Sequence, residues 1–125
     1  MLDVAKARSR RLTRSGDFER VYREGDSNGN RFLVLHRFPR GDAPDESPRI
    51  GVSVGKRVGG AVERNKVKRA LREAIGGIEA RLPQGMDFVI VARPDVAGLL
   101  EREGQGGVER ELAQLVGEPD DHEGV

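Results

Sequence analysis

The sequence predicts an α/β fold, specifically a two-layer α-β sandwich in which helices pack on one mixed sheet of about four strands. Two segments alternate apolar and polar residues with the period of a strand, and a third is a short apolar run. Three further segments carry apolar residues at helical spacing. The 125 residues suffice for one domain with one core, and the chain has no cysteine with which to form a disulfide.

A short helix is predicted from Ser15 to about Gly25. Serine is a favoured residue for the N-terminal cap of a helix, and glycine suits its end. The apolar residues Phe18, Val21 and Tyr22 are spaced three and four positions apart, so they share one narrow helical face. A face of this kind ordinarily packs on the core.

Two strands are predicted next, at Arg31–Phe38 and Arg49–Val54, and the turn-rich loop Gly41–Pro48 joins them. We expect the two strands to run antiparallel to each other. Strand alternation divides the side chains of the first strand between the two faces of the sheet. One face receives Phe32, Val34, His36 and Phe38, and the other receives Leu33 and Leu35.

The second half of the chain predicts a helix, a strand and a further helix. The first helix extends from Ala61 to Ile78, with fraying expected at Gly76–Gly77 because glycine is a poor residue inside a helix. The short apolar run Met86–Ala92 predicts a strand buried on both faces, hence a central and partly parallel one. Asp95–Val116 is predicted to be helical with a break at Gly104–Gly107.

The chain is divided into three parts by composition. Residues 1–14 are basic and polar, which predicts a flexible arm, and residues 117–125 predict an acidic, disordered tail. Residues 15–116 are expected to form the single folded domain. No apolar run approaches the length of a membrane span, and the first residues lack a hydrophobic signal core. We therefore expect a soluble, cytoplasmic protein without a membrane partner.

Charge is segregated along the chain, although the formal net charge is only +1. Residues 1–40 carry ten Lys/Arg against five Asp/Glu, residues 41–82 carry nine against six, and residues 83–125 carry three against ten. Within Arg49–Arg72, eight basic residues face a single acid, Glu63. Such a block creates a strong local field, so the expected partner is a polyanion. The alternative is a solvated face without a ligand, which the segregation of the two signs disfavours.

The basic residues of the predicted helix Ala61–Ile78 fall on one side of it. At about 100° per residue, five cations and one amide lie within about 200° of arc, and apolar residues fill the rest. Neighbouring like charges repel by roughly a few tenths of a kcal/mol per pair, a cost that bound phosphates would remove. Arginine offers planar forks to phosphate, and the amide can bind a sugar or base edge or cap the preceding loop. The predicted RNA-binding residues are Arg64, Asn65, Lys66, Lys68, Arg69 and Arg72, with the loop cations Lys56 and Arg57.

The sequence contains no catalytic site and no metal site of the protein's own. Gly51–Arg57 resembles a phosphate-binding loop, but three residues separate its outer glycines where that motif has four, and Arg57 replaces the magnesium-binding hydroxyl. His36 and His122 lack a neighbouring nucleophile or metal ligand in the pattern, and no serine lies in a nucleophile elbow. We therefore expect no catalytic residue and no protein-bound cofactor.

Five short motifs occur together in one order and spacing. They are the pattern Arg11-Leu12, Asp17-Phe18, Val21-Tyr22, Gly25, then Arg31–Leu35, Gly51–Arg57, Arg64–Arg69 and Asp87–Arg93. In this combination the sequence resembles the protein subunits of bacterial ribonuclease P over roughly residues 10–116. Bacterial ribonuclease P is the ribozyme that trims the 5′ end of precursor tRNA, so the resemblance implies an endonuclease subunit in tRNA processing.

The resemblance also implies structure and partners. It implies a left-handed crossover around the basic helix, where handedness rules alone predict a right-handed one. The basic helix and the loop before it would contact the catalytic RNA, and a cleft between the first helix and the sheet would hold the single-stranded 5′ leader of precursor tRNA. The residues that would line this cleft are Phe18, Tyr22, Val34 and His36. The chemistry would belong to Mg²⁺ in the RNA active site, with one protein per RNA and a monomeric free protein.

Three features depart from the family pattern. Lys66 stands where Arg is usual, His36 stands where Tyr is common, and the C-terminal third is acidic. Without the resemblance, Phe18 and Tyr22 would be assigned to an ordinary face between a helix and the core. Two other functions also stay open, a ribosomal-type RNA-binding module and an autonomous metal-dependent nuclease.

Overall fold

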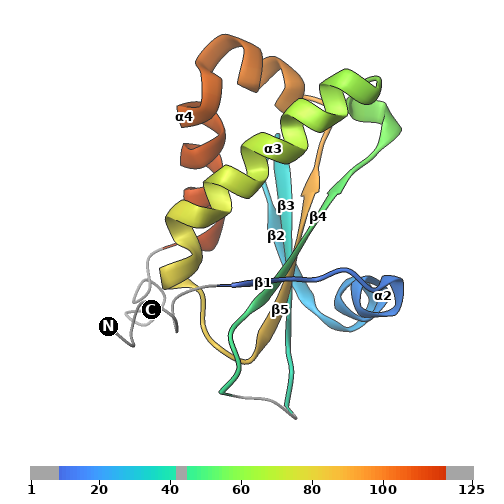
Figure 1. The fold of residues 1–125 in the computed structure, drawn as a ribbon, viewed down its shortest axis with the longest axis vertical. Helices are drawn as coiled ribbons and strands as arrows, with labels where there is room; N and C mark the ends of the chain where they lie inside the picture. Colours follow the sequence, from blue (N-terminus) through green and yellow to red (C-terminus); the bar gives the residue numbers. More distant parts are fainter. Residues whose placement is uncertain (1–8, 42–44, 118–125) are drawn as a thin grey trace.

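A five-stranded open sheet organises the part of the chain that the computed structural model describes, residues 9–41 and 45–117 (Figure 1). The strands are β1 (Arg10–Arg11), β2 (Asp26–Gly29), β3 (Leu33–Pro39), β4 (Arg49–Val54) and β5 (Met86–Ala92), arranged in the order β1-β4-β5-β3-β2. β4 pairs in parallel with β1 and β5, whereas β3 pairs antiparallel with β5 and β2. The predicted mixed sheet is confirmed, with five strands where about four are expected.

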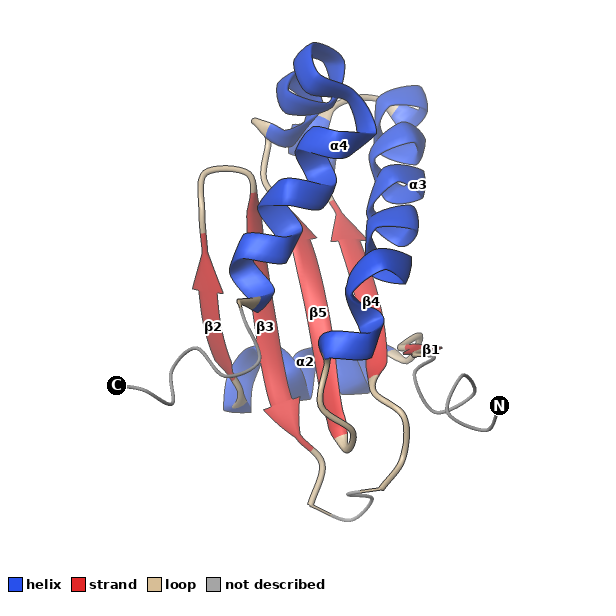
Figure 2. Ribbon diagram, turned by 90° about the vertical axis from the view of Figure 1, so that its left-hand side faces the viewer, coloured by secondary structure: helices blue, strands red, loops and turns tan. Residues whose placement is uncertain are grey.

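Helices cover both faces of this sheet (Figure 2). The long helices α3 (Ala61–Ile78) and α4 (Val96–Val116) lie on one face, and the shorter α2 (Ser15–Glu24) lies on the other. Two single-turn 3₁₀ helices, η1 (Lys56–Val58) and η2 (Glu79–Arg81), flank α3. The residues that the structure describes therefore form the predicted α-β sandwich, with α2 as the only helix of the second face.

The connection from β4 through α3 to β5 is left-handed. In Figure 2, β4 and β5 both point upward, α3 lies in front of the sheet, and the chain enters β5 to the left of β4. A right-handed connection would have placed β5 to the right. The crossover implied by the family resemblance is thus confirmed against the general rule.

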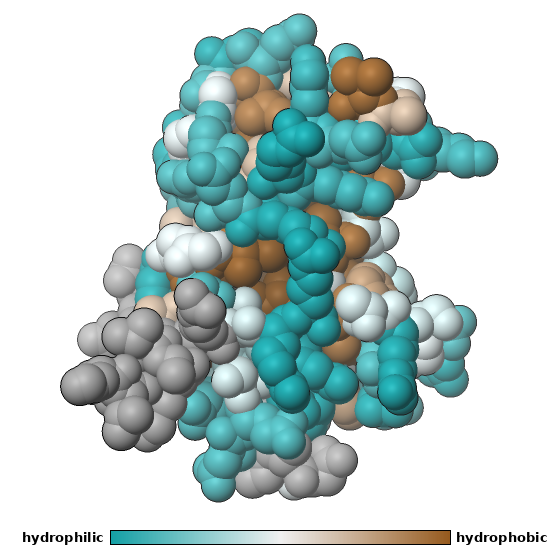
Figure 3. Space-filling view, viewed as in Figure 1, coloured by the Kyte–Doolittle hydropathy of each residue, from teal (hydrophilic) through white to brown (hydrophobic). Residues whose placement is uncertain are grey.

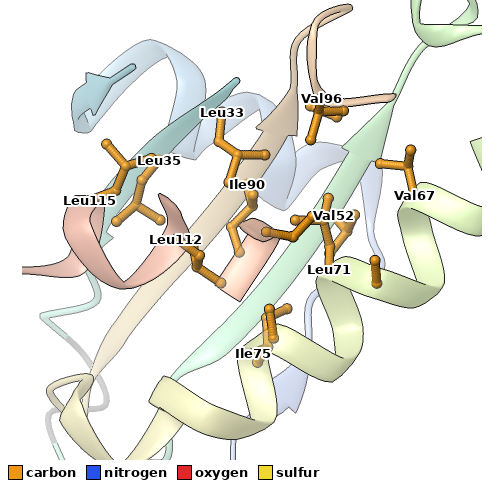
Figure 4. Packing of buried hydrophobic residues seen from close by; sticks show 14 of the residues in the cluster. Leu33, Leu35, Val52, Val67, Leu71, Ile75, Ile90, Val96, Leu112 and Leu115 are labelled. Carbon is orange, nitrogen blue, oxygen red and sulfur yellow. The ribbon is translucent and has the colours of Figure 1, made fainter. Parts of the chain in front are cut away.

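The main core lies between the sheet and the pair α3 and α4 (Figure 4). Its side chains come from alternate positions of the three inner strands and from one stripe of each helix. The fully buried members include Leu33, Leu71, Ile90, Leu99 and Leu112. Because so many aliphatic side chains are removed from water here, this core supplies most of the hydrophobic stabilisation.

β5 is the central strand, as its apolar run predicts. Phe88 and Ile90 point to the main core, whereas Val89 points to a smaller cluster with Leu12 and Val21 under α2. β5 lies between β3 and β4, so these two strands run antiparallel, as expected, without pairing to each other.

Two strands arise where the sequence predicts none. Arg10–Arg11 pairs with Arg49 and Ile50 of β4, and Leu12 beside it is 3% exposed, so part of the expected flexible arm joins the fold. Residues 26–29 (DSNG) pair with β3 although every side chain is exposed. Residues 1–8 and 118–125, which hold most of the predicted arm and tail, lie outside the described residues.

Several helix details differ from the expectations. α2 begins at Ser15, but Arg14 occupies the cap position and no side chain caps the helix. α3 continues through Gly76–Gly77 without fraying, because Ala74, Ile75 and Ile78 bury that turn against the core. α4 does contain the predicted break, which is a kink at Gly104, where φ is 70°.

Phe32 is the one side chain of the first strand whose predicted face is wrong. It precedes β3, which begins at Leu33, so the alternation of the strand does not reach it. Its ring packs against the main core, on the side opposite Val34 and His36.

A network of charges closes the end of the sheet near α2. Asp87 is 0% exposed, and its two carboxylate oxygens accept hydrogen bonds from Nε and Nη2 of Arg49 at 2.8 and 2.7 Å. The hydrogen bond to Asp87 raises the pKa of Arg49. Arg40 Nε lies 3.0 Å from the same carboxylate, and Arg49 also reaches Asp17 of α2 at 3.6 Å. The network therefore ties α2 to the ends of three strands.

Candidate nucleic-acid interface

The eight predicted RNA-binding residues lie on α3 and on η1 immediately before it. Six of them are exposed, and Arg64 and Arg72 are half-buried. The apolar stripe of α3, which includes Val67 and Leu71, is buried against the sheet, so the polar arc points outward. The helical pattern thus predicts correctly which side of α3 faces solvent.

The cations of this surface have no acidic partner among the residues that the structure describes. None of the seven Lys and Arg side chains forms an ion pair with an acid in residues 9–41 or 45–117. On α2, by contrast, Arg20 and Arg23 each lie within 4 Å of a carboxylate of their own helix. The α3 and η1 cations therefore form a concentrated positive surface that can bind phosphates.

The joint between η1 and α3 fixes the direction of the basic helix. Val58 is buried and anchors η1, which leaves Lys56 and Arg57 exposed beside the start of α3. Gly59 then adopts a φ of 157°, and a Cβ there would lie 2.7 Å from the Cβ of Glu63. Glycine is required at this position, because a side chain would strain the turn that joins the two basic segments.

Arg64, Asn65 and Lys66 point to different surroundings. Arg64 Nε is buried without a hydrogen-bond partner in the described part of the chain. Asn65 is exposed and makes no side-chain hydrogen bond with the described residues, so it does not cap the preceding loop. Lys66 lines shallow depressions between α3 and α4, one of them with Arg69. The basic surface thus wraps around the helix and is not a single row.

The other predicted site lies across the sheet, on the face that carries α2. Phe18 and Tyr22 come from α2, and Val34 and His36 come from alternate positions of β3. The Phe18 and Tyr22 rings meet edge to face at 6.4 Å between centroids, and Tyr22 meets His36 at 4.9 Å. Three of the four predicted residues are thus in one aromatic row, and Val34 lies on the same face of β3.

Strand register adds neighbours that the sequence pattern does not indicate. Val34 pairs across the sheet with Val91 of β5, and Val91 pairs with Ser53 of β4, and all three are half-buried. Alternation within β5 and β4 is the local signal for these residues, but only the pairing of the strands places them beside Val34. This row extends the aromatic surface across three strands.

Phe18 and Tyr22 differ in how they are packed. The Phe18 ring covers Gly51, where a Cβ would lie only 2.4 Å from the ring, and it packs with the cluster of Leu12, Val21 and Val89. Tyr22 is 41% exposed. Phe18 is therefore mainly a packing residue, whereas Tyr22 leaves much of its surface exposed to solvent.

Burial lowers the pKa of His36 below its ordinary value. The ring is therefore neutral near pH 7, and its contact with Tyr22 is that of an uncharged aromatic ring. In the described ranges, no group of three or more His, Cys, Asp or Glu side chains is arranged to hold a metal ion. None of the helices described is both long and apolar enough to cross a membrane.

Comparison with known proteins identifies relatives over nearly the whole chain. The family model for ribonuclease P matches residues 7–118. The chain is 42% identical over 95 residues to the ribonuclease P protein component of Brevibacillus brevis, which covers 74% of this chain and 71% of that protein. It is 35% identical over 114 residues to the ribonuclease P protein component of Ligilactobacillus salivarius, and the match covers 89% of this chain and 98% of that protein. The solved structure of the ribonuclease P protein of Thermotoga maritima superposes with a TM-score of 0.74 at 30% identity, and the match covers 85% of this chain and 94% of that one.

Proposed function

The chain belongs to the ribonuclease P protein family, the protein part of the endoribonuclease that matures tRNA 5′ ends, and we propose that it uses opposite faces of its sheet to bind two RNAs. The surface of α3 and η1 contacts the catalytic RNA. The aromatic surface of α2 and β3 holds the single-stranded 5′ leader of precursor tRNA. The free protein is a monomer, and one copy binds one catalytic RNA.

The observation that carries this proposal is the set of seven cations on α3 and η1 without a described acidic partner. Each Lys or Arg that neutralises an RNA phosphate releases condensed counterions, which makes binding strongly dependent on salt. The half-buried Arg64 has a donor atom left without a partner, and a phosphate oxygen could accept its hydrogen bond.

The α2 face suits a single strand of any sequence. Stacking a base on an aromatic ring contributes about 1–3 kcal/mol with little base preference, because every base has a π-face. Tyr22 offers such a ring, with 41% of its surface exposed beside His36 and the half-buried Val34. A leader that differs from one precursor tRNA to another requires this tolerance.

The hydrolytic chemistry is assigned to Mg²⁺ held by the catalytic RNA, with no catalytic residue in this chain. The protein's contribution is to position the leader and to neutralise phosphates near the scissile bond. Holding the leader increases the affinity for precursor tRNA relative to mature tRNA, since only the precursor carries a leader.

A reconstitution assay tests the proposal. Labelled precursor tRNA is incubated with the purified chain alone, with a bacterial ribonuclease P RNA alone, and with both, at a low magnesium concentration. Cleavage at the mature 5′ end is expected only with both components. Cleavage by the chain alone would favour an autonomous nuclease. Binding of the RNA without faster cleavage would favour a ribosomal-type RNA-binding module.

A further inference from the structure

A hollow of about 240 Å³ lies between the C-terminal half of α3 and β1, away from η1. Its lining includes the apolar residues Ile50 and Ile75 and the arginines Arg11 and Arg72. Figure 3 shows a recessed apolar area below α3 in this region, with hydrophilic side chains around it. Its volume exceeds the roughly 30 Å³ of one water molecule severalfold, so it has room for a polyatomic ion.

The hollow is electropositive. Arg72 is half-buried, and burial together with the charge of Arg11 lowers its pKa. Neither arginine forms an ion pair with an acid among the residues that the structure describes. Two neighbouring guanidinium groups with no anion between them are unfavourable by themselves, and an anion placed between them would remove that repulsion.

The one acid in the lining is already engaged. Glu79 Oε2 accepts hydrogen bonds from the backbone N–H of Ser9 at 2.8 Å and from its hydroxyl at 2.6 Å. Arg10, which also lines the hollow, is paired with Glu46 at 3.1 Å. Arg11 and Arg72 therefore keep their donors available for a ligand.

Gly76 leaves the hollow open. It is one of the lining residues, and a Cβ at this position would meet nothing within 4 Å. Packing therefore does not require glycine here, although glycine costs about 1 kcal/mol inside a helix relative to alanine. Gly77 has the same open surroundings and does not line the hollow, so the two positions form a matched pair.

We propose that this hollow is a phosphate-binding site, in which Arg11 of β1 and Arg72 of α3 hold one phosphate group between them. The identification of this group as a backbone phosphate of the catalytic RNA rests on the proposed function. The site would extend the basic surface from α3 across the edge of the sheet. Bidentate guanidinium contacts suit phosphate geometry, whereas a carboxylate or halide would use the two forks less completely.

Gly76→Glu and Gly77→Glu test the site in the full-length protein. Both variants add one negative charge and improve the helix propensity, but only Gly76→Glu places a carboxylate at the hollow. The first arm measures melting temperatures in sodium phosphate and in sodium chloride at equal ionic strength. At tenfold excess over the dissociation constant, phosphate should raise the melting temperature of the parent and of Gly77→Glu by about 5 °C. Gly76→Glu should lose most of this rise.

The second arm measures binding to a bacterial ribonuclease P RNA. Gly76→Glu should bind roughly tenfold more weakly than Gly77→Glu, because hydrogen bonds between charged partners are lost. Arg11→Gln should lower the slope of log affinity against log salt by about 0.7–0.9. Should Gly76→Glu fail to fold in chloride, Arg11→Gln is compared with the parent in both arms.

Each outcome decides the proposal. If the two glutamate variants differ in their affinity for the RNA, the site binds a backbone phosphate. If they differ only in the rise of melting temperature with phosphate, the site binds free phosphate. Equal behaviour of the two variants in both arms overturns the proposal. If the parent neither binds the RNA nor promotes cleavage, the proposed function fails, and the phosphate melts still report on the hollow.

Discussion

Replacement of Tyr22 separates leader binding from folding. Tyr22 is 41% exposed at the edge of α2, whereas Phe18 one turn earlier is packed over Gly51. If the leader stacks on Tyr22, the variant Tyr22→Ala should bind precursor tRNA more weakly and mature tRNA as well as the parent does. Tyr22→Phe keeps the ring and should retain the parent's preference for precursor tRNA.

The structure sets the magnitudes. A buried aromatic side chain removes about 200 Å² from water, so the buried portion of Tyr22 contributes at most about 3 kcal/mol at 25 cal/mol per Å². Residual compactness of the unfolded chain lowers this to about 2 kcal/mol. Phe18→Ala should cost about 3 kcal/mol, near the lower end for a truncated core aromatic. One lost base stack should weaken precursor binding by about 1–3 kcal/mol, or roughly fivefold to 150-fold.

The assay compares dissociation constants of the reconstituted holoenzyme for precursor and mature tRNA, beside urea denaturation of each free variant. Tyr22→Ala should lose more binding selectivity than Phe18→Ala for each kcal/mol of stability lost. If Tyr22→Ala weakens both tRNA forms equally, or neither form, Tyr22 is a packing residue and the leader does not lie on this surface.

Three other predictions test separate features. Lys68→Ala should lower the slope of log affinity against log salt for RNA binding by about 0.7–0.9 and change the free energy of unfolding by less than about 0.5 kcal/mol. The control Arg23→Ala on α2 should leave this slope unchanged. Equal slopes for the parent and both variants would exclude phosphate contacts by Lys68. Asp87→Ala should cost about 3 kcal/mol in urea denaturation, since it leaves Arg40 and Arg49 without their shared buried carboxylate; a cost below about 1 kcal/mol would contradict this role. Burial lowers the pKa of His36 in the folded protein, so protonation of this residue favours the unfolded chain. The free energy of unfolding should therefore be at its full value above about pH 6.5. It should decrease as the pH falls below that value, until the lowered pKa of the folded state is passed. Melting curves of His36→Gln across this range should lack that component, and an unchanged pH profile would show that His36 does not titrate differently on folding.

The sequence predicts the helices and strands whose apolar side chains are buried in the core. The bounds of α3 follow from its apolar stripe, and the central place of β5 follows from its short apolar run. The two strands that it does not predict bury nothing by themselves. β2 forms because β3 offers it a backbone edge and because Asn28 donates a hydrogen bond to the carbonyl of Leu115, 87 residues away. The sequence around residues 26–29 gives no sign of either of these partners.

The candidate sites divide in the same way. Helical period places the basic residues on the outer side of α3, and strand alternation places Val34 and His36 together. Only the family resemblance identifies the leader face as a site, because helical spacing alone assigns Phe18 and Tyr22 to packing. The sequence pattern does not indicate a role for Arg11, since only the pairing of β1 with β4 brings it from the N-terminal segment to Arg72.

β5 makes the two sides of the protein depend on one another. Phe88, Ile90 and Ala92 hold the side with α3 and α4, while Val89 and Val91 belong to the side with α2. One residue inserted or deleted within this strand would exchange the two sets of side chains. Both surfaces would then be lost together, although neither had been altered directly. Changes of length should therefore be tolerated between β3 and β4 but excluded from β5, which constrains how the family can diverge.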